Sequence, residues 1–372
     1  MEAQELKEIF PLTFSKGNKK LCELCQRPAH LQCNQCQVTY YCGVKHQQTD
    51  WVGIHQRICQ FLVPLHAKTA FGLQKLSQAE MKLKKQELIE ICKCEVQIKL
   101  SERKHLEALP AAHLCLRYSK EVYGPNTMEL VPVYLLLAEA NMGLGNLSLV
   151  REFLSQAELV VSENPDCGHG VHQQLCRNLG HLHALSGHLD AALHYFANDV
   201  YHSSEEYGLD STCTCTGLFL LADVFDKQGN TAVVRSMYSE VAQVWHRLLQ
   251  TQIQNPDTVS DSSYDKAQRV EQEKMLMSML EFERKDSRTN PAQTAVVAHC
   301  LAMLAFLGED DQKALGFGNT ALQATASQLI PNHGLAESIH SLIQLVQHRQ
   351  EVPPPGSDQS QGTSCTPSPT EQ

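Results

Sequence analysis

The sequence predicts a mostly α-helical protein in which a small metal-binding finger precedes an α-solenoid of helical hairpins. Two observations support this prediction. Six of the 15 cysteines lie between Cys22 and Cys59, in pairs whose spacing suits metal ligands. Three glycines in the middle of the chain stand 42 residues apart, and the residues around them recur at the same offsets. A repeat of that length is typical of stacked helical hairpins.

Composition fixes the broad class of the protein. With 372 residues, of which 42% are hydrophobic, the chain can bury a core and form two or three domains. Its net charge of −10 argues against a dedicated nucleic-acid binder. No stretch approaches the roughly 18 consecutive apolar residues of a membrane span, so we expect no membrane insertion. The N-terminus, MEAQELKEIFPLTF, does not resemble a signal peptide. We therefore expect an intracellular protein whose cysteines are metal ligands and buried thiols, not disulfides.

The cysteine-rich window has the spacing of two zinc sites. Two Cys-x2-Cys pairs are followed by a Cys-x3-His pair and a His-x3-Cys pair. A Cys-x2-Cys turn places two sulfurs at the separation that tetrahedral Zn2+ requires, and an x3 spacing places two ligands on adjacent helical turns. Eight ligands suit two structural zinc ions, without the open position of a catalytic zinc. Spacing alone does not decide which pairs share an ion. The eight residues are Cys22, Cys25, Cys33, Cys36, Cys42, His46, His55 and Cys59.

The order of these pairs, with Asp50-Trp51 after the third, resembles the MYND-type zinc finger. The resemblance implies interleaved pairs. The first zinc would be bound by Cys22, Cys25, Cys42 and His46, and the second by Cys33, Cys36, His55 and Cys59. The chain departs from the family pattern twice. His46 replaces the usual cysteine, and three residues instead of two separate Trp51 from His55. Because a neutral imidazole is an ordinary zinc ligand, the first site remains chemically sound.

Simpler interpretations of these residues remain open. The cysteines could be buried thiols with accidental spacing, and His46 could be a bystander beside an incomplete first site. The resemblance also implies that Gln47 and Trp51 lie near a surface that binds proline-containing peptides. For Trp51 the alternative is packing against the finger itself. Gln47 is expected to be exposed, which makes it the better candidate for recognition.

The 42-residue period extends beyond the glycines themselves. The glycines are Gly145, Gly187 and Gly229. Seven residues before each of them is a small residue, five residues after it is an apolar residue, and nine residues after it is a larger apolar or aromatic residue. Small residues at fixed offsets let two helices approach, and the glycine suits the turn between them. The recurring positions are Ala138, Gly180 and Ala222, then Val150, Ala192 and Val234, then Leu154, Phe196 and Tyr238.

This pattern resembles tetratricopeptide repeats of the long, kinesin-light-chain type. An earlier, degenerate repeat would have helices at about 66–100 and 106–122, and a later one would turn at Gly308. The expected segments are an N-terminal segment at 1–21, the finger at 22–59, repeats at 60–250, an insertion of a loop and a helix at 251–290, a C-terminal repeat and capping helix at 291–349, and a tail at 350–372. The tail is rich in proline and polar residues and is expected to be disordered.

One further group of metal-ligating residues is less regular. Cys167, His169, His172 and Cys176 lie within ten residues, where the repeat pattern places a linker and the start of a helix. His172 and Cys176 would share a helix face, whereas Cys167 and His169 would lie in the loop. We therefore favour side chains without a metal here, with a second metal-binding region as the alternative.

Neither module carries an enzyme motif, so we expect no enzymatic activity. The chain has no Gly-rich phosphate loop and no G-x-S-x-G elbow. Asn332-His333-Gly334 is too short a match to indicate a SET-domain methyltransferase. A finger followed by helical repeats instead suggests an adaptor or scaffold that binds proteins.

The order of finger and repeats, the length and His46 resemble a MYND-finger protein of motile cilia. The resemblance implies a component of the axoneme of cilia and the sperm flagellum, located in the cytoplasm and cilium and needed for flagellar function and sperm motility. Its partner would be another tetratricopeptide-repeat protein of the axoneme. The alternative is a nuclear corepressor-type adaptor that binds proline-containing peptides, although no basic nuclear-import run supports it.

Overall fold

The computed structural model describes residues 6–8, 20–66, 77–255, 263–285, 290–328 and 333–351. Most of the segment 1–21, part of the insertion 251–290 and nearly all of the tail 350–372 therefore lie outside the described residues. The chain divides into two compact units, Met1–Trp245 with Val259–Met275, and His246–Thr258 with Leu276–Gln372. Among the described residues, no helix combines the length and the apolarity needed to cross a membrane.

The finger consists of a small sheet and short helices. Its strands pair antiparallel in the order β1 (Leu6–Glu8), β2 (Leu31–Cys33), β3 (Tyr40–Tyr41). The helical part runs through α1 (Val44–Asp50), the π-helical turn η2 (Trp51–His55) and α2 (Gln56–Ile58), and α3 (Leu62–His66) follows after a turn. Because β1 pairs with β2, the sheet includes part of the segment 1–21, which the sequence pattern did not indicate.

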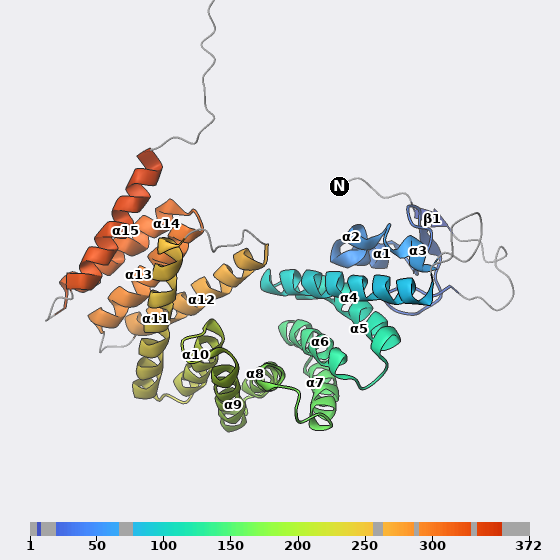
Figure 1. The fold of residues 1–372 in the computed structure, drawn as a ribbon, viewed down its shortest axis with the longest axis horizontal. Helices are drawn as coiled ribbons and strands as arrows, with labels where there is room; N and C mark the ends of the chain where they lie inside the picture. Colours follow the sequence, from blue (N-terminus) through green and yellow to red (C-terminus); the bar gives the residue numbers. More distant parts are fainter. Residues whose placement is uncertain are drawn as a thin grey trace, which may run out of the picture. The chain divides into compact units, whose positions relative to one another are not determined.

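The first unit continues as a row of helices that pack in sequence order (Figure 1). Contacts within the pairs α4–α5, α6–α7 and α8–α9 are more extensive than those of α5 with α6 and of α7 with α8, through which successive pairs stack. The predicted stack of helical hairpins is therefore confirmed. The bounds are α4 Gln78–Ser101, α5 His105–Tyr123, η3 Met128–Leu130, α6 Val131–Gly143, α7 Leu147–Ser162, α8 His169–Leu185, α9 Leu189–Tyr207, α10 Thr212–Lys227 and α11 Thr231–Gln254.

The three repeat glycines lie in the turns inside the hairpins, as predicted. Gly145, Gly187 and Gly229 have φ angles of 74°, 78° and 78°, in the left-handed region that suits glycine. Three residues separate the two helices of each hairpin, and the glycine is the second of them. The turn between α4 and α5 has the same form, but there Arg103 adopts the left-handed conformation, with φ 58°.

The other recurring positions are all buried between helices. Gly180 shows why one of them must be small. A Cβ atom on Gly180 would lie 2.5 Å from the ring of Phe196, the recurring large residue of the same hairpin. The period thus describes a real contact between the two helices of a hairpin.

The second unit contains α13 (Pro291–Leu307), α14 (Asp311–Ala326) and α15 (His333–Glu351), and the division of the chain falls inside α11 and α12 (Ser263–Lys285). Ala298, Ala321 and Ile339 belong to the core that these three helices share. Gly308 lies in the turn between α13 and α14, as expected, but it is not the left-handed residue of that turn. Gly308 has φ −88° and ends α13, whereas Glu309 has φ 61°.

Candidate metal centre

The first set of ligand atoms gathers where the sheet meets α1. Cys22 and Cys25 lie in a turn before β2, Cys42 follows β3 directly, and His46 lies on the first turn of α1. The four ligand atoms lie within 4.8 Å of one another. Nδ1 of His46 is 3.4 Å from Sγ of Cys22 and 3.2 Å from Sγ of Cys42. The structure thus brings His46 into the first set.

The second set is built from the end of β2 and the helical segment. Cys33 ends β2, Cys36 lies in the turn after it, His55 ends η2 and Cys59 follows α2. Their ligand atoms also lie within 4.8 Å of one another, and all four residues are buried. Nε2 of His55 is 3.6 Å from Sγ of Cys36, and the Sγ atoms of Cys33 and Cys59 are 3.9 Å apart.

Both sets fit zinc. With Zn–S of about 2.3 Å and Zn–N of about 2.0–2.1 Å, ligand atoms on one tetrahedral ion are roughly 3.3–3.8 Å apart. The distances given above span 3.2–3.9 Å. Each set supplies four protein ligands, so a filled site is closed. The grouping of ligands in the structure is also the interleaved one that the resemblance implies.

The two Cys-x2-Cys turns have the same backbone form. The amide of Gln26 donates a hydrogen bond to the carbonyl oxygen of Cys22, and the amide of Gln37 donates one to that of Cys33, each with 3.0 Å between N and O. Both glutamines are left-handed, with φ 57° and 58°. Because the same turn is built twice, local spacing identifies ligands without showing which metal they share.

One thiol of the second set is readily ionised. The hydrogen bond from the neighbouring thiol of Cys33 lowers the pKa of Cys36 most, His55 and Thr39 lower the pKa as well, and burial opposes them. The thiolate is the form that binds metal. The surroundings of Cys36 therefore favour the form of the thiol that binds metal.

A buried carboxylate lies behind His55. The Tyr41 hydroxyl donates to Oδ2 of Asp50 at 2.6 Å, and Nδ1 of His55 is 3.7 Å from the same oxygen. With Nε2 of His55 directed at Cys36, this arrangement resembles the carboxylate–histidine–zinc chains that orient metal-binding imidazoles. Burial raises the pKa of Asp50 to about 6. Sequence reasoning used Asp50 only as a motif position and assigned it no role.

The additional residue between Trp51 and His55 lies in the π-helical turn η2. A π-helical turn holds about one residue more than an α-helical turn, so it accommodates the insertion. The same turn contacts α5 closely. A Cβ atom on Gly53 would lie 2.7 Å from Cγ of Pro110 and 2.9 Å from the carbonyl oxygen of Glu107. Glycine is therefore required at this position for the contact.

The finger and the first hairpin share one hydrophobic core. Ile54 and Ile58 of the finger belong to the same buried cluster as Leu88, Ile89 and Cys92 of α4. Fully burying one such aliphatic side chain contributes about 1.5–3 kcal/mol, so the contact is worth several kcal/mol. The finger is thus fixed against α4 and α5.

Two ion pairs cross the same junction. Arg57 of α2 pairs with Glu95 of α4, and Arg117 of α5 pairs with Glu23 of the first Cys-x2-Cys turn. All four side chains retain some exposure, and such pairs contribute only about 0–1 kcal/mol each. They orient the finger, while the apolar core supplies most of the attachment energy.

The two residues that the resemblance placed near a peptide surface are only partly accessible. The expectation that Gln47 is exposed is wrong, because its exposed fraction is 4%. Gln47 and Asp50 are three positions apart and form the buried face of α1. Trp51 is half-buried, its ring centroid lies 5.7 Å from that of His55, and it packs against the cysteine cluster of the finger. These contacts favour a packing role for Trp51.

Comparison with known proteins agrees with this geometry. The MYND finger family model matches residues 22–59. Among solved structures, the crystal structure of BtubC (BKLC) from P. vanneervenii is similar over 73% of this chain and 98% of that chain, with 16% sequence identity and a TM-score of 0.29. A likeness of that degree supports no conclusion about this protein. The chain contains a MYND finger at residues 22–59, with two sites that can each hold a structural zinc ion.

Proposed function

We propose that the protein is a non-enzymatic adaptor that binds other proteins. The observation that carries this proposal is the pair of complete four-ligand sets in the finger. A site filled by four protein ligands leaves no position for water or substrate, whereas a catalytic zinc keeps one open. The zinc ions would therefore stabilise a surface, and the function would reside in what that surface binds.

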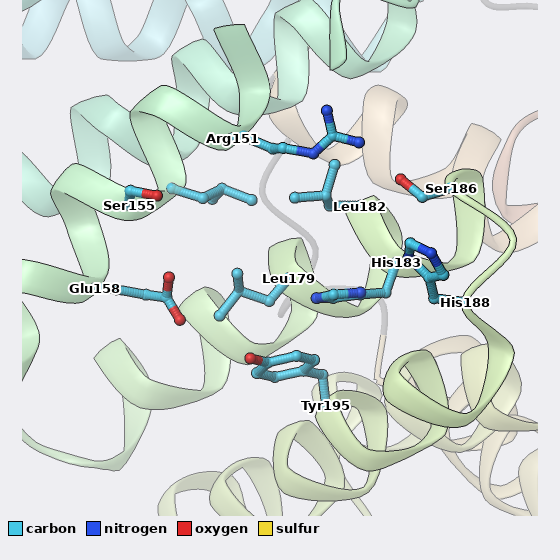
Figure 2. A pocket seen from close by; sticks show the side chains of 10 residues that line it. Arg151, Ser155, Glu158, Leu179, Leu182, His183, Ser186, His188 and Tyr195 are labelled. Carbon is cyan, nitrogen blue, oxygen red and sulfur yellow. The ribbon is translucent and has the colours of Figure 1, made fainter. Parts of the chain in front are cut away.

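A pocket on the helical hairpins offers one place for a partner side chain (Figure 2). Its volume is about 230 Å3, below the roughly 300–1,000 Å3 of small-molecule sites. Figure 2 shows Arg151 and Glu158 of α7 around the same space as His183 of α8 and Tyr195 of α9. The lining residues are Arg151, Leu154, Ser155, Glu158, Leu179, Leu182, His183, Ser186, His188 and Tyr195. The leucines of this lining suit an apolar side chain of a partner protein, and its charged and polar residues suit a polar group next to that side chain.

The finer proposal is that the adaptor is an axonemal scaffold of motile cilia and the sperm flagellum. It rests on the resemblance in the order of finger and repeats, in length and in His46. The partner would be another tetratricopeptide-repeat protein of the axoneme. The nuclear corepressor-type adaptor remains the alternative, but the burial of Gln47 removes its better candidate for peptide recognition.

Localisation separates the two adaptor proposals. Full-length protein carrying a fluorescent tag, expressed in multiciliated cells, should label the axoneme. Diffuse nuclear signal with an unlabelled axoneme would overturn the ciliary proposal and favour the corepressor.

Partner capture tests the pocket. Full-length Glu158→Lys should recover less partner from ciliated tissue than wild type, because it reverses a charge in the lining. Glu152→Lys is the matched control, since Glu152 is also exposed on α7 but does not line the pocket. Equal recovery by both variants would place the partner elsewhere on the protein.

A further inference from the structure

A second group of metal-ligating side chains lies where the loop before α8 meets α9. Cys167 precedes the N-cap of α8, His169 and His172 lie on the first turn of α8, and His202 lies near the end of α9. The sequence pattern included the first three but paired His172 with Cys176. The structure brings in His202 instead, from 30 residues further along the chain.

Cys167 and His172 have the geometry of ligands to one ion. Sγ of Cys167 is 3.5 Å from Nε2 of His172. The corresponding sulfur–nitrogen distances in the finger are 3.2 Å for Cys42 and His46 and 3.6 Å for Cys36 and His55. Zinc–ligand lengths of about 2.3 Å to sulfur and 2.0–2.1 Å to nitrogen imply roughly 3.5 Å between the two atoms.

His169 and His202 form the second pair. Their Nδ1 atoms are 2.9 Å apart. Two imidazole nitrogens on one tetrahedral ion are roughly 3.3 Å apart, so an opening of a few tenths of an ångström would admit a metal. The ring of His172 stacks on that of His202, with centroids 5.0 Å apart and an interplanar angle of 17°, and this stacking joins the two pairs.

The backbone positions the ligands in this loop. Gly168, the N-cap of α8, has φ 90°, a conformation that L-residues rarely adopt, and it joins Cys167 to the start of α8. His169 and His172 then lie three residues apart on one helix face. All four ligand residues are half-buried, so an ion could reach them from solvent.

A metal-free hydrogen bond between neutral histidines would explain the contact between His169 and His202. It would not explain why a thiol and a third imidazole converge beside that pair. The four ligand atoms stand as two close pairs, not as a closed set like those of the finger. Binding must therefore draw the pairs together, through rotation of the His172 and His202 side chains.

We propose that Cys167, His169, His172 and His202 bind a third transition-metal ion, for which Zn2+ is the best chemical match. One thiolate and three neutral imidazoles are ligands that Zn2+ accepts readily. The bound ion would link the loop before α8 to the end of α9. Because this site is more exposed than the second finger site, its metal should exchange more readily.

Metal content of the full-length protein tests the proposal. The protein is equilibrated with excess Zn2+, freed of unbound metal by gel filtration and analysed by mass spectrometry for zinc per chain. Wild type should hold three equivalents, and the double variant Cys167→Ser/His202→Gln should hold two. The matched control is Cys176→Ser/His194→Gln, which changes the same residue types on α8 and α9 outside the cluster, and it should hold three.

Cobalt substitution gives an independent readout. A third equivalent of Co2+ bound through one thiolate should add a weak sulfur-to-cobalt charge-transfer band in wild type and in the control, but not in the double variant. Circular dichroism checks that both variants keep their helix content. Two equivalents in wild type would overturn the proposal without any variant, and a third equivalent retained by the double variant would show unspecific binding to histidines.

Discussion

Asp50 is the residue behind the second metal site that has the clearest effect on its ligands. Its carboxylate accepts a hydrogen bond from Tyr41 and faces Nδ1 of His55, whose Nε2 faces Cys36. A proton on Nδ1 leaves Nε2 free to bind metal, so the carboxylate selects the correct tautomer of the imidazole. Tyr41 in turn fixes the carboxylate. Tyr41 and Asp50 thus together orient the ligand His55.

Replacing this carboxylate should weaken the second site. Asp50→Asn keeps the volume but loses the negative charge behind His55, and we expect zinc affinity there to fall by about 10–100-fold. Competition with a chromophoric chelator measures the change. The control is Asp190→Asn, which alters a carboxylate on α9 far from the finger in sequence. Equal affinities for the two variants would show that Asp50 does not support the ligand.

His299 makes the second unit sensitive to acid. Burial lowers the pKa of His299 most, and together with the effect of His246, whose Nε2 lies 3.0 Å from Nδ1 of His299, it brings that pKa to about 3. In the unfolded chain the pKa is about 6.5. Between these values the unfolded state binds more protons, so the free energy of unfolding must fall as the pH falls from about 6.5 towards 3.

At pH 5 the loss attributable to His299 should be about 2 kcal/mol, from 1.5 pH units at about 1.4 kcal/mol each. Hydrogen exchange at the amides of α13, corrected for the intrinsic pH dependence of exchange, measures it. His299→Gln removes the titrating group and should flatten the pH dependence. If wild type and variant lose the same protection between pH 7 and pH 5, another group is responsible.

At the scale of elements, the same three-residue turn closes hairpins whose sequences differ. Its middle position is left-handed in the turns of Gly145, Gly187 and Gly229, but also at Arg103 and Glu309. Arg103 stands 42 residues before Gly145, so it occupies the glycine position of the degenerate first repeat. A left-handed conformation costs a non-glycine residue about 1–2 kcal/mol. The turn of the first hairpin therefore carries strain that the three glycine turns avoid.

Arg103→Gly should stabilise the first hairpin. Glycine relieves the backbone strain of the folded state, but it also makes the unfolded chain more flexible, which costs free energy on folding. The first effect is larger, so we expect the free energy of unfolding to rise by about 0.5–1 kcal/mol. Gly145→Ala is the reciprocal change, and it should cost about 1 kcal/mol. No atom lies within 4 Å of a Cβ placed at Gly145, so that cost comes from the backbone alone. Hydrogen exchange at the amides of each hairpin measures both effects, and a loss of protection in Arg103→Gly would contradict the turn argument.

Much of the hairpin stack could be predicted because its repeat spacing reflects physical contacts. A turn glycine, a small residue and a large residue at fixed offsets describe one close helix pair, as Gly180 and Phe196 show. Contacts that occur only once in the stack leave no recurring pattern in the sequence. Arg177 donates to Asp199 from Nε at 2.8 Å and to the carbonyl oxygen of Cys213 from Nη2 at 2.8 Å, which ties three helices together. Nothing in the local sequence links these positions.

The metal centre was predictable in its ligands but not in its surroundings. Residue type and spacing identify zinc ligands because coordination chemistry limits both. The burial of Gln47 and the π-helical turn at η2 depend on how the finger folds and packs, so spacing could not indicate them. His202 was missed for the same reason, since it meets Cys167 and His172 only through tertiary packing.

At the scale of the whole molecule, the finger and the hairpins of the first unit depend on each other. The finger is too small to have a large core of its own, so metal supplies much of its folding energy. Ile54 and Ile58 are buried in the core of α4 and α5, so the first hairpin needs the folded finger to cover its apolar surface. Helical repeats contact chiefly their neighbours, so the influence of the finger should decline along the row.

Zinc removal should therefore open more than the finger. With a strong chelator, hydrogen-exchange protection should fall in residues 20–66 and, by at least about 2 kcal/mol, in α4 and α5, because two buried aliphatic side chains lose their contacts. Protection in α9 and α10 should change much less. The control is Cys33→Ser/Cys59→Ser, which lacks two ligands of the second site. In this variant α4 and α5 should already be less protected before chelator is added, and the chelator should change their protection little. Full protection of α4 in chelated wild type would show that the first hairpin does not depend on the metal-bound finger.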